Sequence, residues 1–266
     1  MIDQEFARNI AMLDPSLKQE LNLVLLYFLR LLYKKSDLYL FAKFYGSVGV
    51  DFVMNDFSTT EGITFKSFKL NALSDINSLT QLKTLVSNFD GCELKKNATN
   101  TVFCDGNPSS KIMLIGEAPG QTEDIEGIPF CGRSGKLLDK MLLSIGLDRT
   151  KVYITNTVFW RPPGNRKPTK EETDLCKPFV EYHIKLVDPK LIILVGGTAA
   201  SSVLGVDTGI SRLRGKIYQY KNQYINRHID ATAIFHPAYL LRQPGQKKVA
   251  WQDLQFIKEY IDANNI

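Results

Sequence analysis

Four short apolar segments, separated by helical patterns, constrain the fold of this chain more than any other feature. Segments 111–116, 152–158, 190–197 and 232–239 are rich in Ile, Leu and Val, which is typical of strands buried on both faces. Helical periodicity lies between the first three, and strands that alternate with helices form a parallel sheet with helices on both faces. The sequence therefore predicts an α/β fold, with three α/β/α layers around a central, mainly parallel four-stranded sheet.

Helical patterns supply the layers that would cover this sheet. An apolar stripe runs through residues 134–146, and Ser134 is the expected N-cap of that helix. A second helix is expected over residues 168–187, where Pro178 predicts a kink or a break because proline lacks the amide hydrogen that a helix interior needs. A last helix is expected from about residue 249 to 264.

The first part of the chain lacks this alternation. Its segment 21–33 is strongly apolar, but a membrane-spanning helix needs about 20 such residues and Arg30 interrupts the run, so a buried helix is the better interpretation. We therefore divide the chain into a mostly helical N-terminal extension, residues 1–85, and a second domain, residues 86–266. The extension is either a packing appendage or a module that binds a protein partner.

The composition is that of an ordinary soluble globular protein, with 44% hydrophobic and 23% charged residues. The net charge of +5 slightly favours an anionic partner such as nucleic acid. The start of the chain lacks the charged and apolar regions of a signal peptide, so we expect a cytoplasmic protein whose four cysteines are reduced. We also expect a monomer that does not associate with membranes.

Chemically distinctive segments follow the four apolar segments. They read GEAPG, NTVFWRPPGN, GGTAA and HPAYLLR. Because ligands of open α/β sheets bind at the carboxyl ends of the strands, these segments are expected to meet at one edge of the sheet. The first of them is neither a dinucleotide-binding fingerprint nor a phosphate-binding P-loop, since it has no G-x-G-x-x-G and no Gly-Lys-Ser/Thr pattern.

Acidic and aromatic residues after the first apolar segment allow functional and structural interpretations. Glu117 directly follows that segment, which favours a functional role. Asp124 and Glu126 fit a solvated acidic loop equally well. Phe130 belongs to a type that is most often buried in a core, yet on a loop at this edge it could stack on a planar ring.

Two polar residues stand at or after later apolar segments. Asn156 lies within a run of β-branched and aromatic residues, where its amide must satisfy a donor and an acceptor, and the same pair can read the edge of a base. His236 is expected to end the strand of the last apolar segment and precedes Pro237, a placement that favours function over packing.

Several long motifs together resemble one protein family. The segments GEAPGQTEDIEGIPFCGRSGKLLDKML, NTVFWRPPGNRKPT and FHPAYLLRQPGQKKVAWQDL are similar, in this order, to those of the family 4 uracil-DNA glycosylases, within the wider uracil-DNA glycosylase superfamily. The resemblance covers about residues 88 to 260. It implies hydrolysis of the N-glycosidic bond between uracil and deoxyribose in single- or double-stranded DNA, which leaves an abasic site. Such an enzyme must take the base out of the stack and hold it in a pocket.

The resemblance assigns roles to the residues of that pocket. Phe130 is expected to stack on the flipped uracil beside Gly116, and Asn156 to hydrogen-bond its Watson–Crick edge. His236 is expected to donate to the uracil O2 atom as negative charge builds on the leaving base. Glu117 is the candidate for positioning or activating the attacking water.

The family motifs also predict groups that shape the pocket and hold DNA. Glu123 is expected to form the pocket wall that excludes the methyl group of thymine. Leu240 or Leu241 is expected to fill the space that the flipped base leaves, with Arg242 on a phosphate. Further phosphate contacts are expected from basic side chains, namely Arg161, Arg166, Lys167, Lys247 and Lys248.

Many members of this family hold a four-iron four-sulfur cluster on four cysteines. Cys92 and Cys176 match two of the ligand positions, whereas Phe89 and Trp160 stand at the other two, and Cys104 is the only replacement that we consider. Because such clusters require four thiolates, we predict that no iron–sulfur cluster and no other cofactor or metal is bound. We expect Phe89 and Trp160 to fill the vacated volume by apolar packing.

Other functions remain open at this point. One alternative is a non-catalytic or weakly active DNA-binding homologue. Another is a glycosylase for a different deaminated or mismatched base, such as hypoxanthine or mismatched thymine. A protein partner, if there is one, is expected to bind through the N-terminal extension.

Overall fold

The computed structural model describes residues 76–266 of the chain, so most of the expected extension, residues 1–85, lies outside the described residues. Its central feature is a six-stranded sheet with the order β1-β3-β2-β4-β6-β5. The strands are β1 Asp105–Gly106, β2 Ile112–Gly116, β3 Tyr153–Asn156, β4 Leu191–Val195, β5 Tyr218–Tyr220 and β6 Ile229–Ile234.

The four apolar segments correspond to the four central strands, which are all parallel. The predicted sheet was nevertheless too small, because β1 and β5 add antiparallel edges to it. These edge strands span two and three residues and are not fully buried, so they carry no continuous apolar run. The last predicted strand, 232–239, was placed too late, since β6 ends at Ile234.

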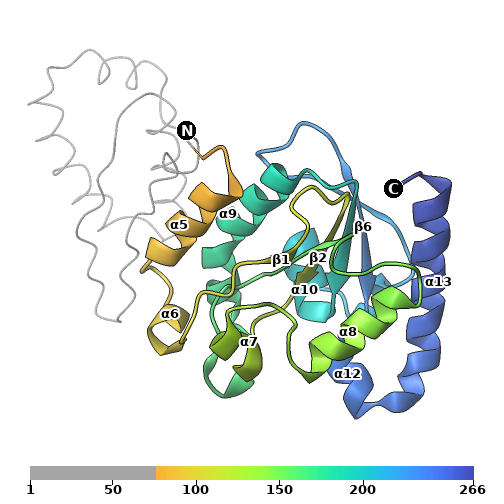
Figure 1. The fold of residues 1–266 in the computed structure, drawn as a ribbon, viewed down its shortest axis with the longest axis horizontal. Coiled ribbons are helices and arrows are strands. Elements are labelled where there is room, and N and C mark those ends of the chain that lie inside the picture. The colour runs from red at the N-terminus through yellow and green to blue at the C-terminus, as the bar shows by residue number, and fades with distance from the viewer. Residues whose placement is uncertain (1–75) are drawn as a thin grey trace, which may run out of the picture. The chain divides into compact units, whose positions relative to one another are not determined.

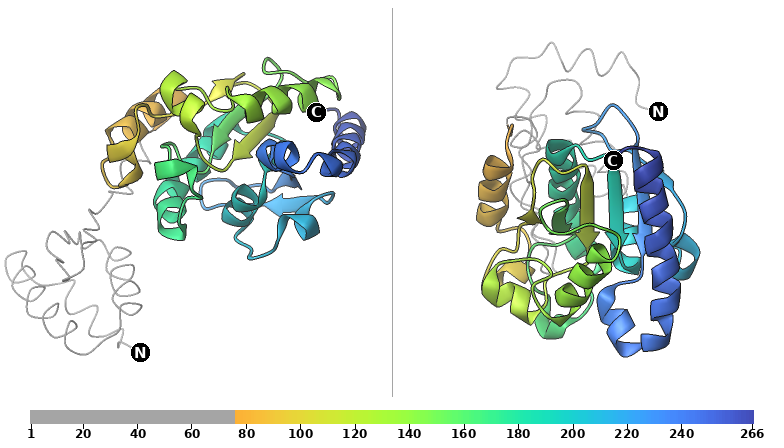
Figure 2. Two further views of the ribbon diagram at one scale, coloured as in Figure 1. Left: turned by 90° about the horizontal axis from the view of Figure 1, so that it is seen from below. Right: turned by 45° about the vertical axis from the view of Figure 1, so that its right-hand side comes forward.

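Helices cover both faces of the sheet (Figures 1 and 2). They are α5 Leu79–Asn88, α6 Leu94–Asn97, α7 Gln121–Glu126, α8 Arg133–Leu143, α9 Lys170–Val187, α10 Gly197–Leu204, α11 Ile210–Leu213, α12 Pro237–Arg242 and α13 Lys247–Ala263. Two short 3-10 helices, η1 Pro163–Asn165 and η2 Pro244–Gln246, lie in the loops.

Alternate residues of β2 show why the arrangement has three layers. Met113 and Ile115 belong to one hydrophobic core, together with residues of α5 and α9. Ile112 and Leu114 point to the opposite face and belong to a second core with residues of α8 and α13. Because successive side chains of a strand point to opposite faces, a strand buried on both sides needs apolar residues at every position.

Two details of the helices concern the predicted N-cap and the predicted kink or break at Pro178. The N-cap of α8 is Gly132, not Ser134, and its amide donates to the Glu123 carboxylate at 2.8 Å. Helix α9 continues through Pro178 without a break. A proline removes the hydrogen bond to the carbonyl four residues earlier, here Asp174, and that residue is exposed so that water can take the place of the lost donor.

Helix α5 crosses the boundary that we drew at residue 85. Ser78 caps its first turn by accepting a hydrogen bond from the Gln81 amide at 3.3 Å, and the helix packs against α9. Residues 79–85 therefore share a helix and a core with the second domain. Among the described residues, no helix combines the length and the hydrophobicity needed to cross a membrane.

Candidate active site

The carboxyl ends of the parallel strands open onto one broad cleft. Gly116 at the end of β2 lies opposite Asn156 at the end of β3. His236 follows the end of β6 by two residues. Glu117, Phe130, Asn156 and His236 all line this cleft, so the structure brings together the residues that the motifs singled out.

Gly116 lies directly against two side chains of the candidate pocket. A Cβ atom at this position would overlap both the Oδ1 atom of Asn156 and the ring of Phe130. Any larger residue would therefore displace the two side chains that are expected to hold the base. The glycine is required here by space, because its backbone φ is not in the left-handed region.

Asn156 carries an unusual polar atom. Its side chain is 1% exposed, and its Oδ1 atom has no hydrogen-bond partner among the described residues. A buried acceptor without a partner costs about 1–3 kcal/mol, so an atom of this kind that lines a cleft is a candidate for contact with a ligand. The Asn156 amide is thus available to a planar group that binds in this part of the cleft.

His236 is held in one protonation state and one orientation. Its Nδ1 atom accepts a hydrogen bond from the Ala238 amide at 3.1 Å, at the start of α12. Burial and, as a smaller contribution, the positive charge of Arg242 together lower the pKa of His236 to about 4. At neutral pH the ring is therefore neutral, and because Nδ1 accepts, Nε2 carries the proton and is a donor. The ring lies 5.7 Å from the Phe130 ring, measured between centroids.

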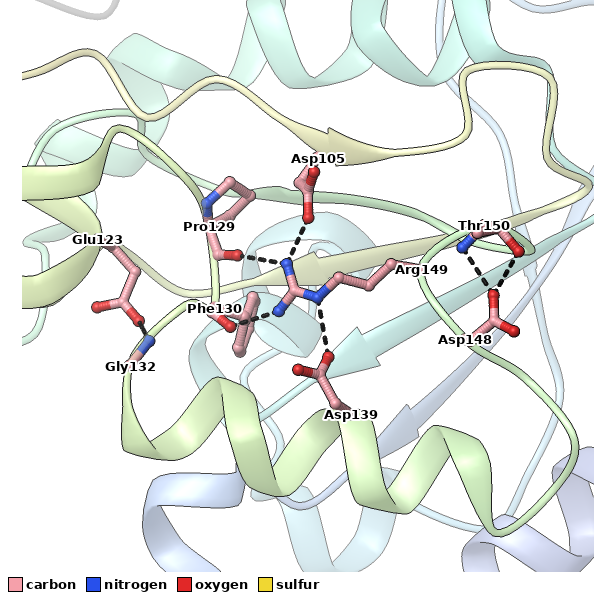
Figure 3. Close-up of polar contacts among 9 residues, drawn as sticks. All are labelled: Asp105, Glu123, Pro129, Phe130, Gly132, Asp139, Asp148, Arg149 and Thr150. Carbon is pink, nitrogen blue, oxygen red and sulfur yellow. Dashed lines mark hydrogen bonds and ion pairs between the residues drawn. The ribbon is translucent and has the colours of Figure 1, made fainter.

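The two carboxylates of the first motif have different surroundings. Glu117 is partly exposed in the cleft directly after β2, and its carbonyl accepts from the Thr157 hydroxyl at 2.6 Å. Glu123 instead uses both carboxylate oxygens on the backbone, accepting from the Gly120 amide at 3.1 Å and the Gly132 amide at 2.8 Å. Glu123 thus organises the loop around the pocket, as Figure 3 shows for Gly132.

The predicted DNA contacts divide by exposure. Leu240 is 1% exposed and packs in the core, so it cannot reach DNA, whereas Leu241 is 36% exposed. Arg242 at the end of α12 and Lys247 at the start of α13 are both exposed. Of the two predicted leucines, Leu241 is therefore the one whose exposure suits a contact with DNA, since α12 turns Leu240 inward.

The basic loop after β3 is partly engaged within the protein. Arg161 donates to the Asn165 side chain at 2.7 Å. Arg166 forms a two-bond ion pair with Glu172, at 2.8 and 2.6 Å. Lys167 is exposed and lines the cleft, which leaves it the least engaged cation of this loop for a phosphate.

Behind the pocket, two thiols and two large aromatic rings occupy the four positions discussed for cluster ligands. The Trp160 side chain is buried, packs on the Phe89 ring at 6.3 Å between centroids, and donates to the Thr101 hydroxyl at 3.0 Å. The buried Cys92 and Cys176 thiols are hydrogen-bonded to each other, which lowers the pKa of Cys92 and raises that of Cys176. Within residues 76–266, no three His, Cys, Asp or Glu side chains are grouped as metal ligands.

Sequence reasoning left the role of Asp124 open and missed Arg149, and both residues build the site. Asp124 is 3% exposed and accepts from the Thr99 and Asn100 amides at 2.8 and 3.2 Å, so it is not part of a solvated loop. Arg149 binds two backbone carbonyls beside the pocket. Asp124 lies within the first motif and Arg149 lies outside the motifs, but the partners of both are distant in sequence, so no local pattern shows these contacts.

Comparison with known proteins identifies the family. The family model described as the uracil DNA glycosylase superfamily matches residues 103–255, more than half of the chain. The chain belongs to the uracil-DNA glycosylase superfamily. The superfamily match includes all the candidate pocket residues, from Gly116 to His236.

Individual relatives place the chain more closely within the superfamily. Proteins named type-4 uracil-DNA glycosylase from Sulfurisphaera tokodaii, Archaeoglobus fulgidus and Thermotoga maritima are 38%, 40% and 37% identical to it. The alignments cover 69%, 63% and 64% of this chain and 85%, 85% and 88% of the relatives. The chain therefore spans most of the length of each of these relatives.

The type-4 relatives correct the cofactor prediction. We predicted no cluster because Phe89 and Trp160 stand at two of the expected cysteine positions. The comparisons contradict this prediction, because the relatives belong to the type-4 class, whose members are iron–sulfur proteins. Phe89 and Trp160 account for the aromatic packing at these positions, and their presence does not determine the cofactor of the protein.

Proposed function

We infer that this chain is a uracil-DNA glycosylase, which hydrolyses the bond between uracil and deoxyribose in DNA and leaves an abasic site. Family membership and the named relatives support this function. The observation that carries it is the buried Oδ1 atom of Asn156, which has no hydrogen-bond partner within residues 76–266 and lies beside Gly116, near the Phe130 ring. This arrangement suits a flat base with a hydrogen-bond donor on its edge.

Base recognition follows from the chemistry of the Asn156 amide. The N3–H group of uracil donates to Oδ1, and the O4 atom of uracil accepts from the side-chain nitrogen. Cytosine presents the opposite pattern at these two positions, so both bonds would be lost. Its N3 acceptor would face the Oδ1 acceptor, and its amino donor would face the side-chain NH₂ donor. Phe130 stacks on the face of the base, which adds affinity that does not depend on base identity.

His236 acts on the leaving base. As the bond between N1 of uracil and C1′ of the sugar breaks, the electron pair stays on the base and its O2 atom gains negative charge. The neutral Nε2–H group donates to O2, and this bond strengthens as the charge develops. A neutral donor suits this site, because a charged imidazolium would have to be buried in the uncomplexed enzyme.

Glu117 orients the water that completes hydrolysis. The water oxygen forms the new bond to C1′, and its proton passes to the carboxylate and from there to solvent. Glu117 directly follows Gly116, the last residue of β2. The water site and the base site are therefore supported by the same strand. Glu123 shapes the same pocket through the loop that it holds, and exclusion of the thymine methyl by this wall is part of the proposal.

DNA lies across the mouth of the cleft. Leu241 fills the space left by the flipped base, and Arg161, Arg242 and Lys247 contact phosphates. These contacts secure the strand whatever its sequence, and they make binding sensitive to salt. We further propose a cytoplasmic monomer, with residues 1–85 as the place where a protein partner would bind.

Cleavage of defined oligonucleotides tests the proposed activity. The protein is incubated with single- and double-stranded DNA that contains one uracil, and alkali then breaks the strand at abasic sites. We expect scission at uracil and none in the matched thymine oligonucleotide. Absence of scission at uracil contradicts the activity and favours a non-catalytic homologue, whereas scission only at inosine or at mismatched thymine favours a different lesion.

A further inference from the structure

Arg149 lies between α8 and β3 and joins three parts of the fold. Its Nε atom donates to Asp139 of α8 at 2.9 Å, and Nη1 donates to Asp105 of β1. Nη1 also donates to the Pro129 carbonyl at 3.1 Å, and Nη2 donates to the Phe130 carbonyl. Figure 3 shows these bonds radiating from one guanidinium group to the carboxylates of Asp105 and Asp139 and to the carbonyls of residues 129 and 130.

Phe130 needs such support because its backbone is strained. Its φ of 54° lies in the left-handed region, which residues other than glycine seldom occupy. Its carbonyl is pressed against α8 at Gly135, where a Cβ atom would overlap it. Strain of this kind persists only where the surroundings hold the backbone in place. Arg149 does so by donating to the carbonyl of the strained residue itself.

The position of this backbone decides the position of the aromatic ring. The Phe130 ring lies against Gly116, where a Cβ atom would overlap both the ring and the Asn156 Oδ1 atom. Glu123 fixes the far end of the same segment through the Gly132 amide. Arg149 and Glu123 therefore hold residues 129–132 from both ends, and the ring between them has little freedom to leave the base site.

Arg149 is poorly suited to contact DNA itself. Two carboxylates, Asp105 and Asp139, pair with its single positive charge, so the cluster repels a phosphate. Its side chain is also absent from the residues that line the cleft. Its effect on the reaction must therefore pass through the segment that it holds.

We propose that Arg149 is a positioning residue for uracil-DNA hydrolysis, which keeps the Phe130 ring in the stacking position through the carbonyls of residues 129 and 130. This inference rests on the proposed function. It requires that removal of the guanidinium lowers the rate of base removal, leaves the affinity for undamaged DNA unchanged, and has no further effect once the Phe130 ring is gone.

A double-mutant cycle tests the route of the effect. Arg149→Met is expected to lower kcat/KM for uracil-DNA by about 100-fold. A displacement of a binding group by about 1 Å can cause a loss of this size. The loss should fall on kcat, with the affinity for undamaged DNA within about twofold. In the Phe130→Ala background the same substitution should change kcat/KM by less than about twofold. An equal loss in both backgrounds overturns the proposal.

Matched variants separate positioning from loss of stability. Arg227 also binds a carboxylate and backbone carbonyls, namely those of Asp188 and Pro189, but it lies outside the cleft. Arg227→Met should lower the melting temperature and leave kcat/KM of the folded protein unchanged. Arg149→Lys should recover part of the activity, because an ammonium group can still reach one carbonyl and one carboxylate.

Amide hydrogen exchange gives a measurement that does not depend on activity. Arg149→Met should increase exchange at residues 129–132, and Arg227→Met should leave exchange there unchanged. Unchanged exchange in Arg149→Met contradicts the proposal even if activity falls. If the wild-type protein fails to release uracil while the exchange difference is present, the proposed function fails and the structural role of Arg149 stands.

Discussion

Asn156 and Trp160 lie on one short segment, yet their surroundings are opposite in kind. Asn156 faces the base pocket and keeps a buried oxygen without a partner among the described residues. Trp160 faces the core, where its ring packs on other aromatics and its Nε1–H group has an acceptor. The two ends of this segment therefore have different roles. Trp160 stabilises the core, whereas only Asn156 keeps a hydrogen-bond acceptor available for a ligand.

Truncation of Trp160 is expected to have the largest effect on stability, and it tests the packed end of the segment. Trp160→Ala should lower the free energy of unfolding by about 3–5 kcal/mol, because it leaves a cavity in a close-packed cluster. Its kcat per folded molecule should remain near that of the wild type. Denaturant unfolding followed by circular dichroism gives the first value. Trp251, which is 43% exposed, provides the control, and an equally small loss for both substitutions would contradict the packing account.

Truncation of His236 tests the pocket region. His236→Ala should lower kcat/KM for uracil-DNA by about 100- to 1000-fold, the usual effect of removing a donor aimed at developing charge. Its melting temperature should change much less than that of Trp160→Ala. Single-turnover cleavage assays measure the rate, and the exposed His228→Ala serves as the control. Near-normal activity of His236→Ala would remove this residue from the chemistry.

Leu241 is expected to have a smaller effect that depends on the substrate. Leu241→Ala should lower kcat/KM on double-stranded uracil-DNA by about tenfold, part of the few kcal/mol that unstacking a base costs. Single-stranded substrate should be much less affected, because no base pair has to be replaced. Parallel assays on both substrates test this, with the exposed Leu143→Ala on α8 as the control. Equal losses on both substrates would refute the proposed wedge.

The smallest expected effect is the response to pH between 5 and 8. Because the folded-state pKa of His236 is lowered to about 4, its ring stays neutral over this range and kcat/KM should show no titration near 6.5. His236 should contribute a loss of stability as the pH falls from 6.5 to about 4, since the unfolded chain binds the proton first. Rates measured at constant ionic strength test this, and a tenfold loss per pH unit that begins near 6.5 would contradict the neutral donor.

The sequence predicts elements that have a periodic apolar pattern and site residues that belong to a motif. Buried strands such as β2 and β4 are apolar at every position, so their pattern is visible, whereas the two residues of β1 show none. The role of Arg149 depends on carbonyls about twenty residues away, which only the folded chain brings to it. Leu240 likewise points inward because of the position at which α12 begins, and a motif does not specify that position.

The most direct test of the account replaces the amide of Asn156 by an apolar group of similar shape. Asn156→Leu should lower kcat/KM for uracil-DNA by about 100-fold or more. Its free energy of unfolding should equal or exceed that of the wild type, because an unsatisfied buried acceptor is removed. Activity and unfolding measured on the same preparation decide the matter. Near-normal activity, or a loss of stability with a proportionate loss of activity, would show that Asn156 is a structural residue and not the reader of the base.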